Sequence, residues 1–140
     1  MSSTGKASIF LVEDEDRLRH LVKLFLQDEG FDVVEAADGG EAVEVYKARG
    51  PFDVVLLDLN LPVMTGVEVC RQIKQADPSQ RIVICSAAVI QDHEKELAEQ
   101  GVTRFLTKPY HPGELIQQIL EEIGGAAHHS EIVEAVALSL

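Results

Sequence analysis

The chain contains no tryptophan, two tyrosines and five phenylalanines in 140 residues. Little aromatic surface is therefore available for stacking on bases or sugars. Basic residues are also scarce, since twelve Lys and Arg stand against twenty-four Asp and Glu, for a formal net charge of −12. Because nucleic-acid binding depends on clustered Lys and Arg, we expect no direct nucleic-acid binding by this chain. An acidic surface favours cations and basic proteins as partners.

Long apolar runs are missing as well. No stretch approaches the roughly 20 residues that span a bilayer, and Met1–Lys6 lacks the charged start and apolar core of a secretory signal. We therefore expect a cytoplasmic protein without a membrane partner. The two cysteines, Cys70 and Cys85, lack metal-ligand spacing and lie among apolar residues. We expect reduced, buried packing residues rather than redox centres.

Strand-like and helix-like patterns alternate along the chain. The predicted strands are 8–12, 31–36, 54–57, 81–85 and 104–107, the second of them an edge strand. The predicted helices are one capped by Asp16 and ending before Gly30, then 41–49, one between Gly66 and Asp77, then 91–100 and 112–123. Five β-α units imply a parallel sheet covered on both faces, in a chain of one-domain size. We place this domain at 1–125.

One stretch, Asp53–Gly66, organises the rest of the chain. Its apolar run Val54–Leu57 is typical of a strand buried on both faces, and the run ends on Asp58. A carboxylate inside that layer would carry a large desolvation cost, so Asp58 must lie where the strand emerges. The carboxyl ends of parallel strands are where open α/β sheets bind their ligands.

Other predicted strands also end on polar residues. Glu13-Asp14 follows the first strand, Ser86 follows the fourth and Lys108 follows the fifth. In a parallel sheet these ends share one edge with Asp58, so three carboxylates including that of Asp58, a hydroxyl and an ammonium should gather there. Any single polar residue after a strand can be an ordinary loop residue, but the whole set is not expected by chance.

Three neighbouring carboxylates need a cation. Two unit charges about 4 Å apart oppose each other by about 4 kcal/mol at an effective dielectric near 20. Few protein ligands with room for water suit Mg²⁺ better than Ca²⁺. A metal and a lysine can also offset the charge of a phosphoryl group while a carboxylate attacks phosphorus. The residues therefore predict an aspartyl-phosphate with Mg²⁺ as cofactor.

Four ordered motifs carry a family resemblance. They are Glu13-Asp14-Glu15, Asp58–Gly66, Ser86-Ala87 and Phe105–Pro109. Together they resemble the receiver domain of bacterial two-component response regulators, over about residues 7–123. The resemblance implies a flavodoxin-like (βα)5 doubly wound sheet with strand order 2-1-3-4-5. It also implies a chemotaxis-type single-domain receiver that acts in a phosphorelay.

The resemblance further implies a role for each acidic residue. Asp58 would take phosphate from a phosphohistidine on a sensor histidine kinase or a phosphotransfer protein. Asp14 and Asp58 would bind Mg²⁺ through their side chains, Asn60 through its backbone carbonyl and Glu13 through a water. Glu13 departs from the Asp that is frequent at its position, which should shift the metal-bound water rather than abolish binding.

The remaining motif residues would sense the phosphate. Lys108 would pair with one phosphoryl oxygen, and Ser86, beside Ala87, would hydrogen-bond another. Phe105, where Tyr is frequent, would swing inward when Ser86 moves, and Pro109 would follow a cis peptide that aims Lys108. Phosphorylation would change the face built by 91–100, 104–107 and 112–123 for an unknown downstream protein or a homodimer.

Two other functions remain open. An aspartate-nucleophile phosphatase or phosphotransferase also pairs a strand-end Asp with Mg²⁺ and Lys, but usually carries an acid where Asn60 stands, two past Asp58. A degenerate receiver would be a constitutive binding module. We favour a switch that acts on no substrate beyond its own phosphorylation and dephosphorylation at Asp58.

Residues beyond the predicted domain leave further choices open. The chain is either a stand-alone receiver or a piece of a larger regulator or hybrid kinase. In the tail, 126–140, one side of a possible short helix carries Ile132, Val133, Val136 and Leu140. The tail is either a frayed end or a helix that docks on its own domain or on a partner.

Overall fold

The computed structural model describes residues 6–87 and 90–124. Within this part, five parallel strands form one sheet in the order β2-β1-β3-β4-β5. The strands are β1 Ser8–Val12, β2 Asp32–Ala36, β3 Val54–Leu57, β4 Ile82–Ser86 and β5 Phe105–Thr107. The predicted fold class and strand order are confirmed, and β2 is an edge strand as expected.

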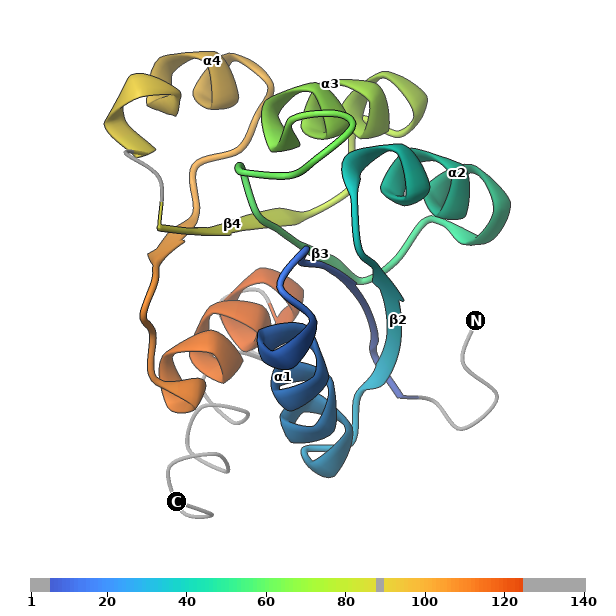
Figure 1. The fold of residues 1–140 in the computed structure, drawn as a ribbon, viewed down its shortest axis with the longest axis vertical. Helices are drawn as coiled ribbons and strands as arrows, with labels where there is room; N and C mark the ends of the chain where they lie inside the picture. The colour runs from blue at the N-terminus through green and yellow to red at the C-terminus, as the bar shows by residue number, and fades with distance from the viewer. Residues whose placement is uncertain (1–5, 88–89, 125–140) are drawn as a thin grey trace.

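Helices cover both faces of the sheet (Figure 1). They are α1 Asp16–Asp28, α2 Gly39–Arg49, α3 Gly66–Ala76, the short 3₁₀ turn η1 Ile90–Asp92 and α4 Glu94–Glu99. A C-terminal helix follows β5 and is described over residues 112–124. In Figure 1, α2, α3 and α4 lie on one face, while α1 and the C-terminal helix lie side by side on the other.

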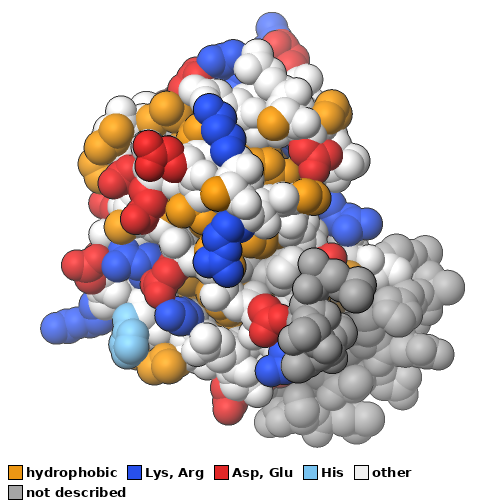
Figure 2. Space-filling view, turned by 90° about the vertical axis from the view of Figure 1, so that its right-hand side faces the viewer, with side chains coloured by type: hydrophobic (Ala, Val, Ile, Leu, Met, Phe, Trp, Pro, Cys, Tyr) orange, Lys and Arg blue, Asp and Glu red, His pale blue; other side chains and the backbone are white. Residues whose placement is uncertain are grey.

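The surface carries charges of both signs. On the face drawn in Figure 2, acidic and basic side chains are interspersed with hydrophobic ones. Of the helices in the described part of the chain, none is both long and apolar enough to cross a membrane. The predicted domain boundary at residue 125 and the predicted tail helix lie outside the described residues.

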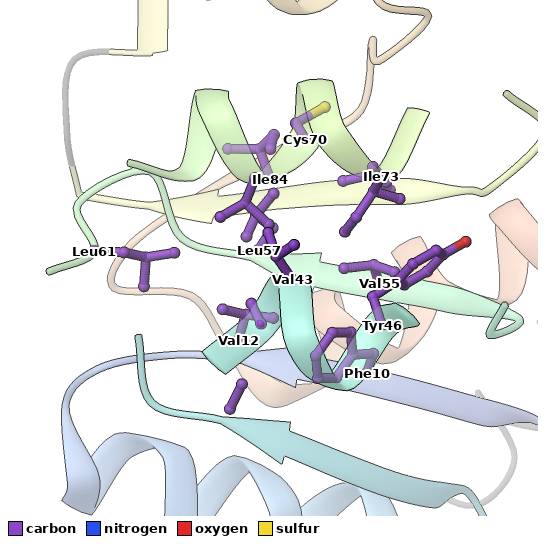
Figure 3. Close-up of a cluster of buried hydrophobic side chains, with 14 of the residues drawn as sticks. Phe10, Val12, Val43, Tyr46, Val55, Leu57, Leu61, Cys70, Ile73 and Ile84 are labelled. Carbon is purple, nitrogen blue, oxygen red and sulfur yellow. The ribbon is translucent and has the colours of Figure 1, made fainter. Parts of the chain in front are cut away.

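The two faces of β3 explain its uninterrupted apolar sequence. Val55 and Leu57 pack with side chains from α2 and α3, as Figure 3 shows. Val54 and Leu56 point to the opposite face and pack with α1 and the C-terminal helix. All four side chains are at most 2% exposed, so the strand has no solvent face on which a polar residue could alternate.

The cysteines divide between these two cores. Cys70 on α3 packs in the first cluster and Cys85 on β4 in the second, and neither is bonded to another cysteine. Burial raises the pKa of the Cys70 thiol to about 11 and that of Cys85 to about 12. Both are buried packing residues, as the sequence predicts, and their thiolates are strongly disfavoured at neutral pH.

The predicted cap of α1 is wrong. Glu15 rather than Asp16 is the N-cap residue, with extended backbone and no side-chain cap hydrogen bond. Asp16 is instead the first helical residue, and its Oδ1 accepts a 2.7 Å hydrogen bond from Arg19. Arg19, one turn further along the same helix, also donates from its Nη1 to the carbonyl of Glu13.

Two other helices differ from their predicted bounds. α2 begins at Gly39, two residues before the predicted Glu41, because the carboxylate of Asp38 caps the backbone N–H of Glu41. The predicted helix 91–100 is interrupted, with η1 followed by the six-residue α4. Leu97 is the buried residue of α4, so a thin apolar stripe supports only a short helix.

Candidate functional site

The strand register brings the predicted site residues to one edge of the sheet. Val12 on β1 is level with Leu57 on β3, so Glu13 and Asp58 emerge side by side. A 3.2 Å hydrogen bond from the Asp58 N–H to the Val12 carbonyl continues this pairing past the strand end. Each carboxylate thus takes the first position beyond an apolar strand, where its desolvation cost falls.

Glu13, Asp14 and Asp58 form a carboxylate cluster. One oxygen from each lies within 4.8 Å of the others. Glu13 and Asp58 are buried, with exposures of 4% and 5%, whereas Asp14 is exposed. The cluster is therefore open to solvent on the Asp14 side and closed on the side of the sheet.

Lys108 neutralises the buried half of the cluster. Its Nζ donates to Oδ2 of Asp58 at 2.7 Å and to Oε1 of Glu13. The backbone N–H of Lys108 also donates to the carbonyl of Ser86 at 3.1 Å, which anchors the lysine to the end of β4. Buried charges are stable only when paired in this way, because the interior does not solvate them.

Asp58 is held at its other oxygen by two donors. The Ser86 hydroxyl donates to Oδ1 at 2.9 Å, and the Asn60 backbone N–H donates to the same oxygen at 3.0 Å. Ser86 is fully buried. The Asp58 carboxylate is therefore fixed in orientation by groups from β4, β5 and its own loop.

Burial and pairing set the ionisation of Lys108 and Glu13. Burial alone would lower the pKa of Lys108, but its hydrogen bonds to Asp58 and Glu13 outweigh this and raise the pKa. Burial raises the pKa of Glu13, which Lys108 and the backbone N–H of Glu15 only partly offset. The site therefore favours the charged form of Lys108, whereas burial disfavours the charged form of Glu13.

Gly66 has a structural role that the sequence patterns did not predict. This residue begins α3, and its N–H donates to the Leu59 carbonyl at 2.9 Å. A Cβ at Gly66 would lie 2.1 Å from the carbonyl oxygen of Asp58, closer than atoms can approach. Only glycine lets α3 pack this tightly against the loop that carries Asp58. The signal available in the sequence was a glycine at the start of a predicted helix, eight residues after Asp58.

The remaining predicted residues lie around this group. Phe105 on β5 pairs in register with Ile84 and packs, partly buried, against the core beneath α2 and α3. Ala87 is exposed directly after β4. The Lys108–Pro109 peptide is cis, as expected, and so is Gly50–Pro51, which was not foreseen.

The oxygen donors fit a small divalent cation. Glu13, Asp14 and Asp58 supply three carboxylates, and each carboxylate has about four lone-pair positions, so the hydrogen bonds described above leave free capacity. Hard oxygen ligands with an open, solvated side are typical of Mg²⁺ sites. The cluster can therefore accept a metal without displacing the groups that orient Asp58.

The chain is similar in sequence to a known protein family and to one of its characterised members. Residues 9–120 match the family model described as the response regulator receiver domain. The chemotaxis protein CheY of Bacillus subtilis is 36% identical over 112 residues, which cover 79% of this chain and 92% of that protein.

Two solved structures are similar to this chain and carry the metal. The receiver domain of the sensor histidine kinase PA1611 from Pseudomonas aeruginosa has a magnesium ion in its active-site cleft. It is 28% identical with a TM-score of 0.77, and the alignment covers 86% of this chain and 100% of that one. TrrA from Thermotoga maritima, in complex with Mg²⁺-BeF, is 27% identical with a TM-score of 0.73, covering 83% and 98%.

Proposed function

The chain belongs to the response regulator receiver domains of two-component systems, and we propose that it is a phosphoacceptor switch with Asp58 as its nucleophile. It receives phosphate from a sensor histidine kinase or a phosphotransfer protein. It then changes the surface formed by α4, β5 and the C-terminal helix, which a downstream protein reads. It turns over no separate substrate.

One observation carries this proposal. The carboxylate of Asp58 accepts hydrogen bonds from Ser86 and Asn60 at one oxygen and from Lys108 at the other. A nucleophile needs this fixed orientation, and a phosphoryl group needs donors already aimed at its position. Ser86 at the end of β4 and Lys108 directly after β5 provide such donors.

The transfer step balances without further reagents. A carboxylate oxygen of Asp58 attacks phosphorus, and an O–P bond forms as the P–N bond of the phosphohistidine breaks. The imidazole leaves with the electron pair. Lys108 shifts its Nζ toward a phosphoryl oxygen, and the Ser86 hydroxyl donates to another.

Mg²⁺ is the cofactor that these residues suit. Glu13, Asp14 and Asp58, with the backbone carbonyl of Asn60, would hold it, Glu13 through a water. Bound there, it offsets the negative charge of carboxylates and phosphoryl group alike. The magnesium ions of the PA1611 and TrrA structures support this assignment.

The switch depends on Ser86. Phosphorylation adds about −1.5 to −2 of charge at Asp58, and that charge biases the fold only through contacts that differ between states. Without phosphate, the Ser86 hydroxyl donates to Asp58. Ser86 is also the last residue of β4, which pairs with β5 and its partly buried Phe105. Withdrawal of the hydroxyl from Oδ1 toward the phosphoryl group therefore moves the end of β4, and Phe105 follows.

Acetyl phosphate with Mg²⁺ tests the nucleophile. Intact-mass spectrometry should show one added phosphoryl group on the wild-type chain and none on Asp58→Asn. Asp28→Asn, an exposed aspartate at the end of α1, is the matched control and should be labelled as the wild type is. Phosphate on Asp58→Asn would contradict the assignment, and steady hydrolysis of a phosphate monoester would favour a phosphatase.

Beryllofluoride with Mg²⁺ tests the switch separately. Amide NMR shifts should spread from Asp58 to α4, β5 and the C-terminal helix in the wild type. In Ser86→Ala the shifts should stay near Asp58. Equal spreading in both proteins would remove Ser86 from the switch while leaving the phosphoacceptor assignment intact.

A further inference from the structure

The peptide bond between Glu13 and Asp14 connects two of the three carboxylates in the cluster. Because a peptide unit is planar, the direction of the Glu13 carbonyl fixes the position of the Asp14 Cα beyond the end of β1. The Glu13 N–H donates to the Ala36 carbonyl at the end of β2, at 3.1 Å. The Glu13 carbonyl accepts a 2.9 Å hydrogen bond from Nη1 of Arg19 on α1. A side chain from the following helix therefore orients the peptide that carries both acids.

Asp14 depends on its backbone more than the other two acids do. Hydrogen bonds from Lys108 hold the carboxylates of Glu13 and Asp58 directly. The Asp14 side chain is exposed, and no residue among 6–87 and 90–124 donates a hydrogen bond to its carboxylate or forms an ion pair with it. Its position beside the other carboxylates therefore depends on the peptide that Arg19 orients.

Arg19 also fastens a helix start that lacks a side-chain cap. Glu15, the N-cap residue of α1, makes no side-chain cap hydrogen bond. Arg19 lies four residues after this cap and reaches back to the Glu13 carbonyl, while its Nη2 donates to Oδ1 of Asp16 at 2.7 Å. These two hydrogen bonds join the first turn of α1 to the loop that carries the acids.

The guanidinium of Arg19 is itself held on a third side. Its Nε donates to Oε1 of Glu35 on β2 at 3.1 Å, and Lys23 holds the other oxygen of Glu35 at 2.7 Å. The Arg19 side chain is 17% exposed. A planar guanidinium carries donors in a rigid fork, so it can serve three acceptors in different directions at once. Strand β2 thus fixes the guanidinium against the loop.

We propose that Arg19 is a positioning residue for the metal site, which orients the Glu13–Asp14 peptide so that the Asp14 carboxylate lies beside those of Glu13 and Asp58. Arg19 acts through the backbone and is not itself a ligand. The inference rests on the proposed Mg²⁺ site and adds to it a residue outside the set of ligands.

The charge of Arg19 makes the proposal easy to separate from an electrostatic effect. A cation near a metal site repels the metal ion, so loss of the guanidinium charge alone would strengthen Mg²⁺ binding. Loss of the orienting hydrogen bond would weaken it. The two effects have opposite signs.

Isothermal titration calorimetry with MgCl₂ tests the positioning role. Arg19→Met should raise the Kd for Mg²⁺ about tenfold, a loss typical of removing a group that orients metal ligands. Lys23→Met is the matched control, because Lys23 lies on the same helix, pairs with the same Glu35 and carries the same charge. This control should leave the Kd unchanged or slightly lower. Binding by Arg19→Met as tight as in the wild type, or equal weakening in both variants, would overturn the proposal.

Amide hydrogen exchange without Mg²⁺ tests the loop independently of the metal. The Glu15 N–H donates to Oε2 of Glu13 at 3.0 Å, so its exchange reports the order of the loop. This amide should exchange several-fold faster in Arg19→Met than in Lys23→Met. The amide of Leu26, a buried residue of α1, should change alike in both variants, since each removes one partner of Glu35.

The exchange experiment also separates the two proposals. Equal Glu15 exchange in the two variants would overturn the role of Arg19. A wild-type chain that binds no Mg²⁺ would instead overturn the proposed metal site, and the exchange rates would still decide whether Arg19 orders the loop.

Discussion

The ammonium of Lys108 lies 2.7 Å from Oδ2 of Asp58, although fifty positions of sequence separate them and strand β4 lies between the strands they follow. The same ammonium donates to Glu13, so one cation serves two buried carboxylates. Two acids at this edge are tolerable only because β5 delivers a lysine to the same place.

Lys108→Met should reduce the free energy of unfolding by about 3 kcal/mol without Mg²⁺. Removing one partner of a buried ion pair costs about 3–5 kcal/mol, and the exposed side at Asp14 favours the low end. Urea unfolding with and without Mg²⁺ measures this, and Mg²⁺ should recover more stability in the variant than in the wild type. A variant as stable as the wild type in metal-free buffer would show that Lys108 does not neutralise the site.

Asp14→Asn should weaken the stabilisation by Mg²⁺. A ligand that binds only the folded state raises Tm as its concentration rises. Loss of one carboxylate ligand should raise the Mg²⁺ concentration needed for a given increase in Tm about tenfold. Differential scanning fluorimetry across MgCl₂ concentrations measures the shift. Glu15→Gln, at the next exposed carboxylate, is the control, and an equal shift in both would mean unspecific charge screening rather than a site.

Val63→Asn should stabilise the protein by about 1 kcal/mol. Val63 has a φ of 73°, in the left-handed region that costs an ordinary residue about 1–2 kcal/mol. Asn adopts this region more readily, and Val63 is 84% exposed, so little packing is lost. Chemical denaturation gives the change, and the β-branched control Val63→Ile should leave stability unchanged. A less stable Asn variant would show that the Val63 side chain contributes more than its strain costs.

Glu35→Gln should change the acid side of the stability curve. The hydrogen bond from Lys23, 2.7 Å long, and that from Arg19 hold the pKa of Glu35 below its ordinary 4.5. A lowered carboxyl pKa contributes stability above pH 4.5 that is lost as pH falls through the folded-state pKa.

The expected loss in Glu35→Gln at pH 7 is up to about 1 kcal/mol, because the pair is partly exposed. The difference from the wild type should vanish in strong acid and shrink in high salt. Urea unfolding between pH 2 and 7 measures it, with the exposed Glu29→Gln as control. A difference that persists unchanged at pH 2 would rule out the ionic origin.

The sequence by itself determined the layers of this protein and the content of its site. Val54–Leu57 could only be a strand buried on both faces, and Asp58 could only lie at its end, because desolvation forbids an acid inside. The positions of Glu13, Ser86 and Lys108 directly after predicted parallel strands placed them on the same edge. These are local patterns, fixed by periodicity and by the cost of burying charge.

The tertiary structure decided the contacts between these residues. Register made Glu13 and Asp58 level, and this let one lysine serve both. Gly66 gained its role from α3 packing on the Asp58 carbonyl, and Glu35 on β2 gained two cationic partners from α1, Arg19 and Lys23. Such outcomes depend on atoms that approach from distant parts of the chain, and their distances and competing partners are absent from any local sequence pattern.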